Sequence, residues 1–262
     1  MIQTTLTVLI PAFNEKDRLP PTLAEIEKFH KKFPGVISKV LIVDDGSTDG
    51  GRTVERAMRW MNRLPLRVDR LAENVGKWGA IHYGIGEATT DAILLMDADG
   101  SASIWELGRC KQFPEYYKQR VAIFGSRSIK GASTVGKSYL RHIVSEGYRM
   151  YVKFMYFLAS GKLDVHDMQA PWKFFWRTSI MKELKVDRWA GDIELALALD
   201  CERVNHPLQF VHMRGSKVKP TAMISMALNT VGVVTGHWTW RRNIKKGVVK
   251  PIYESSKITN GK

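Results

Sequence analysis

The sequence predicts an α/β fold, a doubly wound and mostly parallel sheet with helices on both faces. Strand-like and helix-like segments alternate from residue 4 to residue 125, a pattern that favours parallel strands joined by right-handed helical crossovers. The 262 residues can bury a full hydrophobic core, and 44% hydrophobic with 25% charged residues is ordinary for a globular protein. Polar residues follow the apolar runs, at the strand ends where ligands bind in such sheets.

Each predicted element follows from its own pattern of apolar residues. Continuous apolar runs bounded by polar residues and glycine predict buried strands. These strands are expected at residues 4–13, 38–47, 64–73, 91–99 and 120–127. Apolar residues three and four positions apart, such as Leu19, Leu23 and Ile26, predict helices. The helices are expected at residues 17–33, after Ser47 or Thr48 as the cap, at 76–88 and at 104–119.

The second half of the chain contains two segments with a different pattern. From about residue 137 to residue 160, a basic face opposes an aliphatic and aromatic face, which is typical of a helix in a membrane interface. The basic residues are Lys137, Arg141, Arg149 and Lys153. Packing of this helix against the sheet is the alternative. Residues 221–240 contain no Lys, Arg, Asp or Glu and would reach about 30 Å as a helix. Because small polar residues line one side and both ends are basic, we favour an in-plane helix over a membrane span.

The charge of the chain narrows the class of partner. The formal net charge is +14, and from Arg203 to the end there are eleven Lys and Arg residues against one acid, Glu254. Such a tail suits a membrane surface with anionic lipids, or nucleic acid. We expect no nucleic acid as partner, because the basic residues cluster beside apolar helices and are not interleaved with exposed aromatic residues. The two cysteines, Cys110 and Cys201, lack metal-type spacing and indicate a reducing compartment. The N-terminus has no signal-peptide pattern.

Two aspartates end the apolar run AILLMDADG at residues 92–100. Side chains alternate along a strand, so Asp97 and Asp99 are expected on the same side, just past the strand's end. Two like charges this close repel each other unless a positive charge lies between them. Hard oxygen ligands suit Mg²⁺ or Mn²⁺, so the pair predicts a divalent metal site. A solvated turn is the alternative.

Seven motifs occur in the order found in glycosyltransferase family 2. They are VLIPAFNE, VDDGSTDG, NVGKWGA, DADG, GSR, DMQAPWKFF and RWAGDIE. Within the family, the chain most resembles polyprenyl-phosphate sugar transferases such as dolichyl-phosphate glucosyltransferases and mannose synthases. The resemblance covers roughly residues 5–220 and implies the nucleotide-sugar-binding fold called GT-A. We therefore expect a GT-A domain at residues 1–220 and a membrane-associated helix with a basic tail at residues 221–262.

The resemblance implies a donor site at the ends of the first, second and fourth strands. Its residues would be Pro11, Phe13, Glu15, Asp44, Asp45, Lys77, Asp97, Ala98 and Asp99. One carboxylate of Asp44 and Asp45 is expected to accept hydrogen bonds from the base or ribose, with capping of the next helix as the alternative. Lys77 opens a helix and is expected at phosphate. Asp97 and Asp99 match the family's Asp-x-Asp, which holds a divalent metal on the diphosphate.

The acceptor is expected to be a phosphate, which needs cations more than it needs a general base. A phosphate monoester has a second pKa near 6 and is mostly ionised at pH 7. Arg127 follows the fifth strand and suits bidentate phosphate contact. The residues expected at the acceptor phosphate are Arg127, Ser128, Lys137, Arg141, Gln169 and Lys173.

Two positions depart from the family's pattern in the motifs NVGKWGA and RWAGDIE. Trp78 stands where the family usually has glycine, and Gly191 stands where an aromatic residue is expected. Asp192 and Glu194 match an acidic pair near the acceptor. We expect Asp192 in the catalytic site, where it positions basic residues or orients the sugar.

The resemblance implies inverting, metal-dependent transfer of glucose or mannose from UDP-glucose or GDP-mannose to dolichyl or polyprenyl phosphate. The enzyme would work in association with a membrane, at its cytoplasmic face. The motifs GSR and RWAGDIE, with Gln169, are closer to the glucosyl branch. An alternative is transfer to a sugar hydroxyl, with Asp192 or Glu194 as the base.

Overall fold

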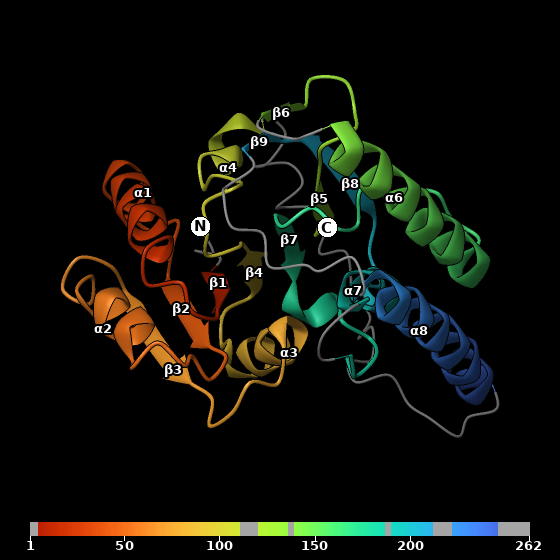
Figure 1. Ribbon diagram of the computed structural model, residues 1–262, viewed down its shortest axis with the longest axis horizontal. Helices are drawn as coiled ribbons and strands as arrows, with labels where there is room; N and C mark the ends of the chain where they lie inside the picture. The colour runs from red at the N-terminus through yellow and green to blue at the C-terminus, as the bar shows by residue number, and fades with distance from the viewer. Residues whose placement is uncertain (1–4, 111–119, 136–138, 187–189, 212–221, 246–262) are drawn as a thin grey trace, which may run out of the picture.

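The computed structural model describes residues 5–110, 120–135, 139–186, 190–211 and 222–245 (Figure 1). Its main sheet has seven strands in the order β3-β2-β1-β4-β7-β5-β8. The strands are β1 (Leu6–Ala12), β2 (Lys39–Asp44), β3 (Leu66–Arg70), β4 (Ala92–Leu95), β5 (Ala122–Ser126), β7 (Lys173–Trp176) and β8 (Arg203–Pro207). A second sheet pairs β6 (Ser133–Val135) with β9 (Gln209–Val211).

The main sheet is mixed, because one central strand runs against the others. β1, β2, β3 and β4 pair in parallel, and β5 pairs in parallel with β8. β7 lies between β4 and β5 and is antiparallel to both. The prediction of a mostly parallel sheet is confirmed, whereas β7 was not predicted. Its four residues are buried on both faces and too few to show a period.

Helices cover both faces of the sheet (Figure 1). One core joins the sheet to α1 (Leu19–Lys32), α2 (Arg52–Met58) and α4 (Glu106–Arg109). The other core joins it to α3 (Lys77–Glu87), α6 (Tyr139–Ser160), α7 (Gly191–Ala198) and α8 (Ala222–Lys245). Alternation along β1 explains the two layers, because Val8 and Ile10 belong to the first core and Leu9 belongs to the second.

Two of the predicted helices differ from the observed ones. Within the helix predicted at 104–119, α4 has only four residues, and residues 111–119 lie outside the described part of the chain. α2 begins at Arg52, later than predicted, and Asp49 bonds its first turn by accepting from the Thr53 backbone N–H at 3.1 Å. Ser47, one of the two predicted caps, instead donates its hydroxyl to Asp44.

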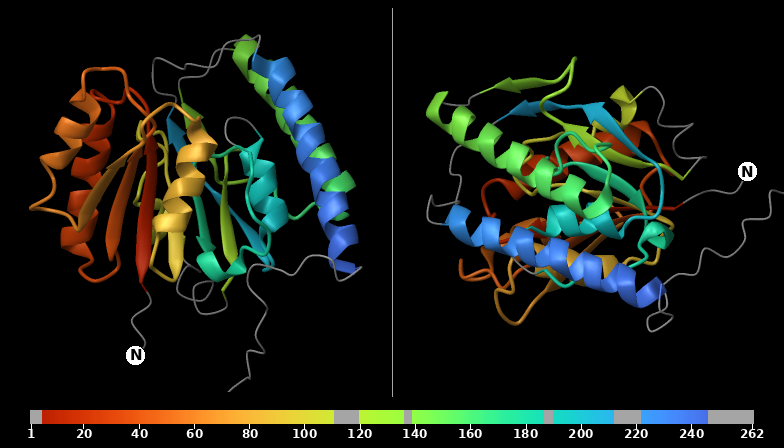
Figure 2. Two further views of the ribbon diagram at one scale, coloured as in Figure 1. Left: turned by 90° about the horizontal axis from the view of Figure 1, so that it is seen from below. Right: turned by 90° about the vertical axis from the view of Figure 1, so that its right-hand side faces the viewer.

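The two long helices α6 and α8 lie side by side along one flank of the molecule (Figure 2). The Tyr151 hydroxyl of α6 donates to the Ala227 carbonyl of α8 at 2.9 Å. α6 packs on the sheet through Val152, Met155, Tyr156 and Ala159, which are buried. Apolar residues remain exposed on both helices, namely Met150, Phe154, Phe157, Leu158, Leu228, Val231 and Trp238.

The helix predicted at the membrane interface is therefore present, but Arg149 of its predicted basic face points inward and is 8% exposed. None of the helices in the described ranges is long and apolar enough to cross a membrane. Membrane contact remains a prediction. So does the domain boundary at residue 220, which falls in the undescribed segment 212–221.

Candidate active site at the carboxyl edge of the sheet

Most of the predicted site residues lie where β1, β2, β4 and β5 end. Parallel strands present their carboxyl ends at one edge of the sheet, so these loops meet there. β7 runs the other way and therefore begins at this same edge, with Lys173 paired to Leu95 and Phe124. The last parallel strand on this side, β8, ends at Pro207 beside Ser126 of β5.

The loop after β2 approaches the loop before α3 closely. Gly46 has a φ of 64°, and a Cβ atom there would lie 2.6 Å from the backbone carbon of Glu73. A glycine is therefore required for both conformation and space. This contact brings Asp44 and Asp45 close to the start of α3.

Asp44 and Asp45 are both buried and both bond to neighbouring loops. Asp44 accepts from the Ser47 backbone N–H at 3.2 Å, and the Arg70 guanidinium lies 3.4 Å away. Asp45 accepts from the Asn74 side-chain amide at 2.8 Å and from the Val75 backbone N–H at 2.8 Å. The Gly76 N–H also donates to Asp45, at 3.0 Å. Their predicted contact with base or ribose stays a prediction, and their observed work is to hold the loops of the site.

Asp97 and Asp99 are only partly buried and each lies beside a cation. The Lys77 ammonium donates to Asp97 Oδ1 at 2.5 Å. The Arg18 guanidinium lies 3.8 Å from Asp99 Oδ2, whose partner oxygen Oδ1 accepts from the Ser101 backbone N–H at 3.0 Å. The side chains of Asp97 and Asp99 are 28% and 23% exposed. Ala98 between them is buried and fixes the turn, since its carbonyl accepts from Thr22 at 2.9 Å.

Lys77 is held protonated by the acids around it. Burial lowers the pKa of Lys77, but the charges of Asp97, Asp192 and Asp99 and the bond to Asp97 outweigh this effect. The net result is a pKa above the ordinary value for lysine. A permanent cation therefore lies at the N-terminus of α3, where backbone N–H groups also favour an anion.

The residues at this edge fit a divalent cation. Asp97 and Asp99 offer hard oxygen donors that are exposed and that already attract Lys77 and Arg18, so a positive charge is favoured between them. Within the described ranges, no group of three or more His, Cys, Asp or Glu side chains is arranged to hold a metal ion. A substrate such as a diphosphate would supply further oxygen ligands.

Glu15 and Arg18 connect the first strand to this pair of acids. Arg18 donates through Nε to Glu15 at 2.7 Å and faces Asp99 with Nη1. Phe13 is partly buried and Pro11 is buried beside them. Arg18 was not predicted, because in the sequence it reads as an ordinary charged residue at the start of a helix.

Arg127 forms a two-pronged ion pair with the fully buried Asp167. Its Nε and Nη2 donate to the two carboxylate oxygens at 2.7 and 3.0 Å, and its backbone N–H donates at 3.2 Å. The ring centre of Phe210 lies 5.2 Å from the guanidinium carbon. Burial lowers the pKa of Arg127, but Asp167, Asp192 and Asp97 raise it more. Since Asp97 and Asp192 act on both Lys77 and Arg127, these four charges share one electrostatic site.

A second arginine, Arg149 of α6, approaches the same carboxylate. Its Nε lies 4.0 Å from Asp167. Burial raises the pKa of Asp167, but the bond and charge of Arg127 and the charge of Arg149 lower it below its usual range. The amphipathic pattern predicted Arg149 on the surface of the helix. In the structure, Arg149 instead lies beside Asp167 and helps to keep it ionised.

The other predicted acceptor residues vary in position. Ser128 is exposed and Gln169 is partly buried at this edge. Lys173 is 1% exposed and donates to Asp192 at 2.7 Å, so it lies beneath the site. Lys137 and the side chain of Arg141 lie outside what the structure describes.

Glu194 of the predicted acidic pair lies away from solvent. It is 2% exposed, and its Oε2 accepts from the backbone N–H groups of Lys185 and Val186, both at 2.9 Å. Asp192, two residues earlier, has a side chain that is 26% exposed and faces the shared site. Of the two, Asp192 is the more exposed, and Glu194 lines a cavity beside α8.

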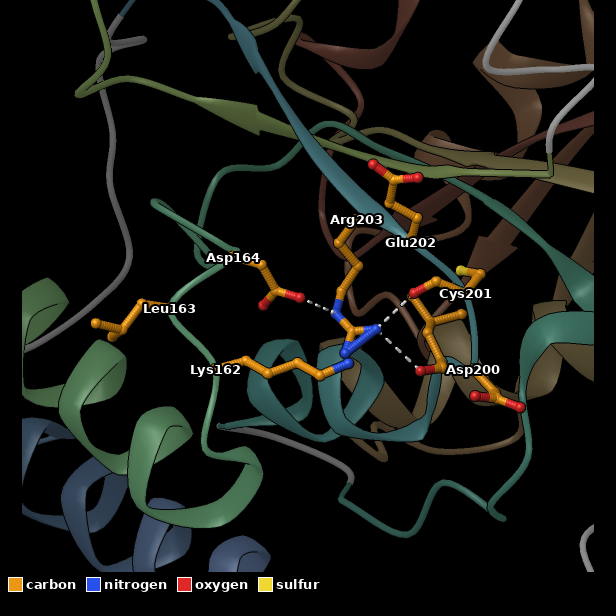
Figure 3. A pocket seen from close by; sticks show the side chains of 8 residues that line it. Lys162, Leu163, Asp164, Asp200, Cys201, Glu202 and Arg203 are labelled. Atoms are coloured by element: carbon orange, nitrogen blue, oxygen red, sulfur yellow. Dashed lines mark hydrogen bonds and ion pairs between the residues drawn. The ribbon is translucent and has the colours of Figure 1, made fainter.

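A cavity of about 660 Å³ lies at the opposite edge of the sheet, where β8 begins (Figure 3). Its central Arg203 is satisfied by the Tyr156 hydroxyl at 3.0 Å and by the carbonyls of Leu199 and Cys201 at 3.1 and 2.8 Å. These bonds give the arginine a structural role. Another cavity, of about 810 Å³, borders the site between residues 73–75, Lys182 and α8.

Comparison with known sequences identifies the family. Residues 7–183 match the family described as Glycosyl transferase family 2. The chain is 29% identical over 233 residues to the dolichyl-phosphate beta-glucosyltransferase of Homo sapiens, covering 82% of this chain and 70% of the relative. It is 31% identical over 235 residues to the protein of the same name from Drosophila melanogaster, covering 82% and 69%.

Solved structures share the fold at low sequence identity. One is glucosyl-3-phosphoglycerate synthase from Mycobacterium tuberculosis in complex with Mn²⁺, UDP-glucose and phosphoglyceric acid, with a TM-score of 0.60 and 16% identity. The match covers 89% of this chain and 79% of that one. Another is mannosyl-3-phosphoglycerate synthase from Rubrobacter xylanophilus, with a TM-score of 0.59, 18% identity and coverage of 97% and 78%. The α/β fold with its mostly parallel mixed sheet is thus GT-A-like. The chain belongs to glycosyl transferase family 2 and is a glycosyltransferase.

Proposed function

We propose that this enzyme transfers glucose from UDP-glucose to dolichyl phosphate or a related polyprenyl phosphate, with inversion at the anomeric carbon. The relatives named dolichyl-phosphate beta-glucosyltransferase support the acceptor and the sugar. The observation that carries the proposal is the arrangement of charge at one edge. The partly exposed acids Asp97 and Asp99 lie beside Lys77 and Arg18, respectively. The charge of Asp97 also helps to raise the pKa of Arg127.

On the donor side, Asp97 and Asp99 would hold Mn²⁺ or Mg²⁺ against the diphosphate. The bound metal would offset the negative charge that develops on the leaving diphosphate. Lys77, whose pKa is raised, supplies a second positive charge at the N-terminus of α3. Glu15 and Asp45 hold Arg18 and the 74–76 loop in position around this group.

On the acceptor side, Arg127 would bind the lipid phosphate. Asp167 fixes the plane of the guanidinium from below through two hydrogen bonds. An oxygen of the phosphate attacks the anomeric carbon, the bond from that carbon to the diphosphate oxygen breaks, and UDP leaves with the electron pair. Because the attacking oxygen is already ionised at pH 7, no proton has to be removed.

Transfer to a sugar hydroxyl would instead require a general base at the site. Glu194 is buried and bonded to backbone N–H groups, which argues against this role. Asp192 accepts from Lys173 at 2.7 Å. This contact holds the Asp192 carboxylate in place, which suits it to orienting the sugar.

We further propose that the exposed apolar residues of α6 and α8 rest on the cytoplasmic face of a membrane. Phe154, Leu158, Leu228 and Trp238 are each more than two-fifths exposed and belong to two adjacent helices. Monomeric soluble proteins seldom expose a large contiguous apolar patch. A lipid acceptor enters from a bilayer, so contact along this flank brings its head group toward the site.

A donor screen tests the proposal. The full chain is incubated with Mn²⁺, a short polyprenyl phosphate and either UDP-glucose or GDP-mannose, and release of nucleoside diphosphate is measured. We expect UDP-glucose to be consumed only when the lipid phosphate is present. Consumption of neither donor, or equal consumption with a neutral sugar in place of the lipid phosphate, would overturn it. Flotation on liposomes with and without anionic lipid tests the membrane contact separately.

A further inference from the structure

Trp78 and Gly191 fit together at the edge of the site. Trp78 is the second residue of α3 and is 2% exposed. A Cβ atom at Gly191 would lie 2.1 Å from Cδ2 and 2.2 Å from Cγ of this tryptophan. Real Cβ atoms do not approach other atoms so closely, so the indole occupies the space of a side chain at position 191. Glycine is therefore required at position 191 for space. Its backbone conformation does not require glycine, since the φ of Gly191 is not in the left-handed region.

Each partner is next in sequence to a charged residue of the site. Lys77 precedes Trp78 and bonds Asp97 at 2.5 Å. Asp192 follows Gly191 and accepts from Lys173 at 2.7 Å. The contact therefore joins the first turns of α3 and α7 at the point where both present a charge to the shared site. The backbone here is also unusual, since Ala190, directly before Gly191, has a φ of 62°.

The two positions are the ones at which the sequence departs from the motifs that it resembles. The resemblance implies a glycine in place of Trp78 and an aromatic residue in place of Gly191. The structure shows the indole on one helix filling the space beside the bare Cα atom on the other. Core packing is sensitive to a single methylene group, so a swap that conserves total volume preserves the spacing of two elements.

We propose that Trp78 and Gly191 are a positioning pair, which sets the distance between the Lys77–Asp97 pair and the Asp192–Lys173 pair and thereby shapes the donor site. This inference rests on the proposed function. Both residues are buried. Their effect is transmitted through the neighbouring residues Lys77 and Asp192, and a displacement of about 1 Å at a catalytic group can cost about 10²-fold in rate.

The test compares three variants with the parent enzyme in UDP-glucose transfer. Gly191→Ala introduces a Cβ atom into the indole, Trp78→Gly removes the indole, and Trp78→Gly with Gly191→Trp moves the indole to the other helix. We expect each single variant to raise the KM for UDP-glucose and lower kcat, with a combined loss of at least tenfold. The KM for polyprenyl phosphate should stay within twofold. The double variant should recover kcat/KM to within about threefold of the parent.

A matched control comes from the same helix. Gly86 lies in α3, and a Cβ atom there meets nothing within 4 Å. Gly86→Ala should therefore leave both KM values and kcat unchanged. A variant that is merely less stable would lose active enzyme without a selective change in donor KM, so thermal unfolding of every variant is measured alongside. If Gly191→Ala does not fold, Gly191→Ala with Trp78→Leu relieves the clash and is measured in its place.

The outcomes separate this inference from the proposed function. If the parent transfers glucose and Gly191→Ala keeps the parent's donor kcat/KM, the positioning pair is wrong while the function stands. A folded double variant no better than the poorer single variant also overturns the pair. If the parent transfers nothing, the proposed function fails. Calorimetric titration with UDP and Mn²⁺ then decides the pair, with a severalfold loss of affinity expected in Gly191→Ala and its recovery in the double variant.

Discussion

Two acidic pairs end neighbouring parts of the same sheet, yet they differ in almost every physical respect. Asp44 and Asp45, at the end of β2, are 0% and 2% exposed and are bonded by backbone and side-chain groups of two loops. Asp97 and Asp99, after β4, are 28% and 23% exposed and are faced by the side chains of Lys77 and Arg18. β1 alone lies between the two strands.

Under the proposed function, the buried pair holds the loops of the site and the exposed pair binds the ligand. A buried carboxylate that accepts several N–H bonds is committed to the fold, because removing it leaves those donors unsatisfied. A partly exposed carboxylate beside long cationic side chains can exchange them for a metal ion. From the sequence alone, the motifs Asp-Asp and Asp-x-Asp are equally good candidates for binding a ligand. Their burial and hydrogen bonds in the structure distinguish the two roles.

The largest effect of a substitution is expected at the exposed pair, Asp97 and Asp99. Replacing Asp97 with Asn removes charge but little volume, so we expect transferase activity to fall about 10³-fold while the melting temperature changes by no more than about 2 °C. Initial rates with saturating Mn²⁺ and thermal unfolding measure the two effects. A clearly lower melting temperature of the variant would show that Asp97, like Asp45, stabilises the fold.

The buried pair should respond in the opposite sense. Asp45→Ala leaves the N–H groups of Val75 and Gly76 without their acceptor, so the free energy of unfolding should fall by about 3 kcal/mol. Urea unfolding measures this loss. Asp17→Ala is the matched control, because Asp17 is 68% exposed and forms a surface ion pair with Arg56. The two variants should differ clearly, and equal stability would contradict the assignment.

A third strand end, that of β5, extends the comparison to a cation. Arg127→Lys keeps the charge beside Asp167 but loses the two-pronged geometry. We expect the KM for polyprenyl phosphate to rise about 20-fold, a change of roughly 2 kcal/mol, with the KM for UDP-glucose within twofold. Arg59→Lys, on the surface of the molecule beyond α2, is the control. Should donor binding collapse instead, Arg127 belongs to the diphosphate site.

The pH dependence of stability sets the background against which both acidic pairs are measured. Burial lowers the pKa of His237 to about 4, with help from the charges of Lys182 and Arg241. Between about pH 6.5 and pH 4 the unfolded chain therefore binds more protons at this residue, and stability falls as pH falls through this window. We expect a loss of about 1 kcal/mol between pH 7 and pH 5.5. His237→Gln should remove it in urea titrations, and an unchanged slope would contradict this origin.

Local pattern predicted much of the fold. The apolar runs gave β1 to β5, and the spacing of Leu19, Leu23 and Ile26 gave α1. The short segments β7 and α7 were not predicted. Four to eight buried residues show no clear hydrophobic period, and their structure depends on packing against the sheet. A seven-strand mixed sheet could therefore not be drawn from the sequence.

The site divides in the same way. Asp97, Arg127 and Asp192 could be predicted as site residues because each stands in a motif. Their partners are distant in the chain, since Asp167 lies 40 residues from Arg127 and Lys173 lies 19 residues from Asp192. Such pairings depend on which strands become neighbours, and a single sequence carries no record of them. Trp78 and Gly191 were visible as two unrelated departures until the contact joined them.

The reversed strand β7 has a consequence for the size of the substrate. Because it stands between β4 and β5, the acids after β4 and the arginine after β5 are separated by two strand spacings instead of one. Two spacings amount to about 10 Å, which under the proposed function would leave room for a diphosphate on one side of the anomeric carbon and a phosphate on the other. With β4 and β5 adjacent, the gap would shrink to about 5 Å, too little for two phosphate groups with a carbon atom between them.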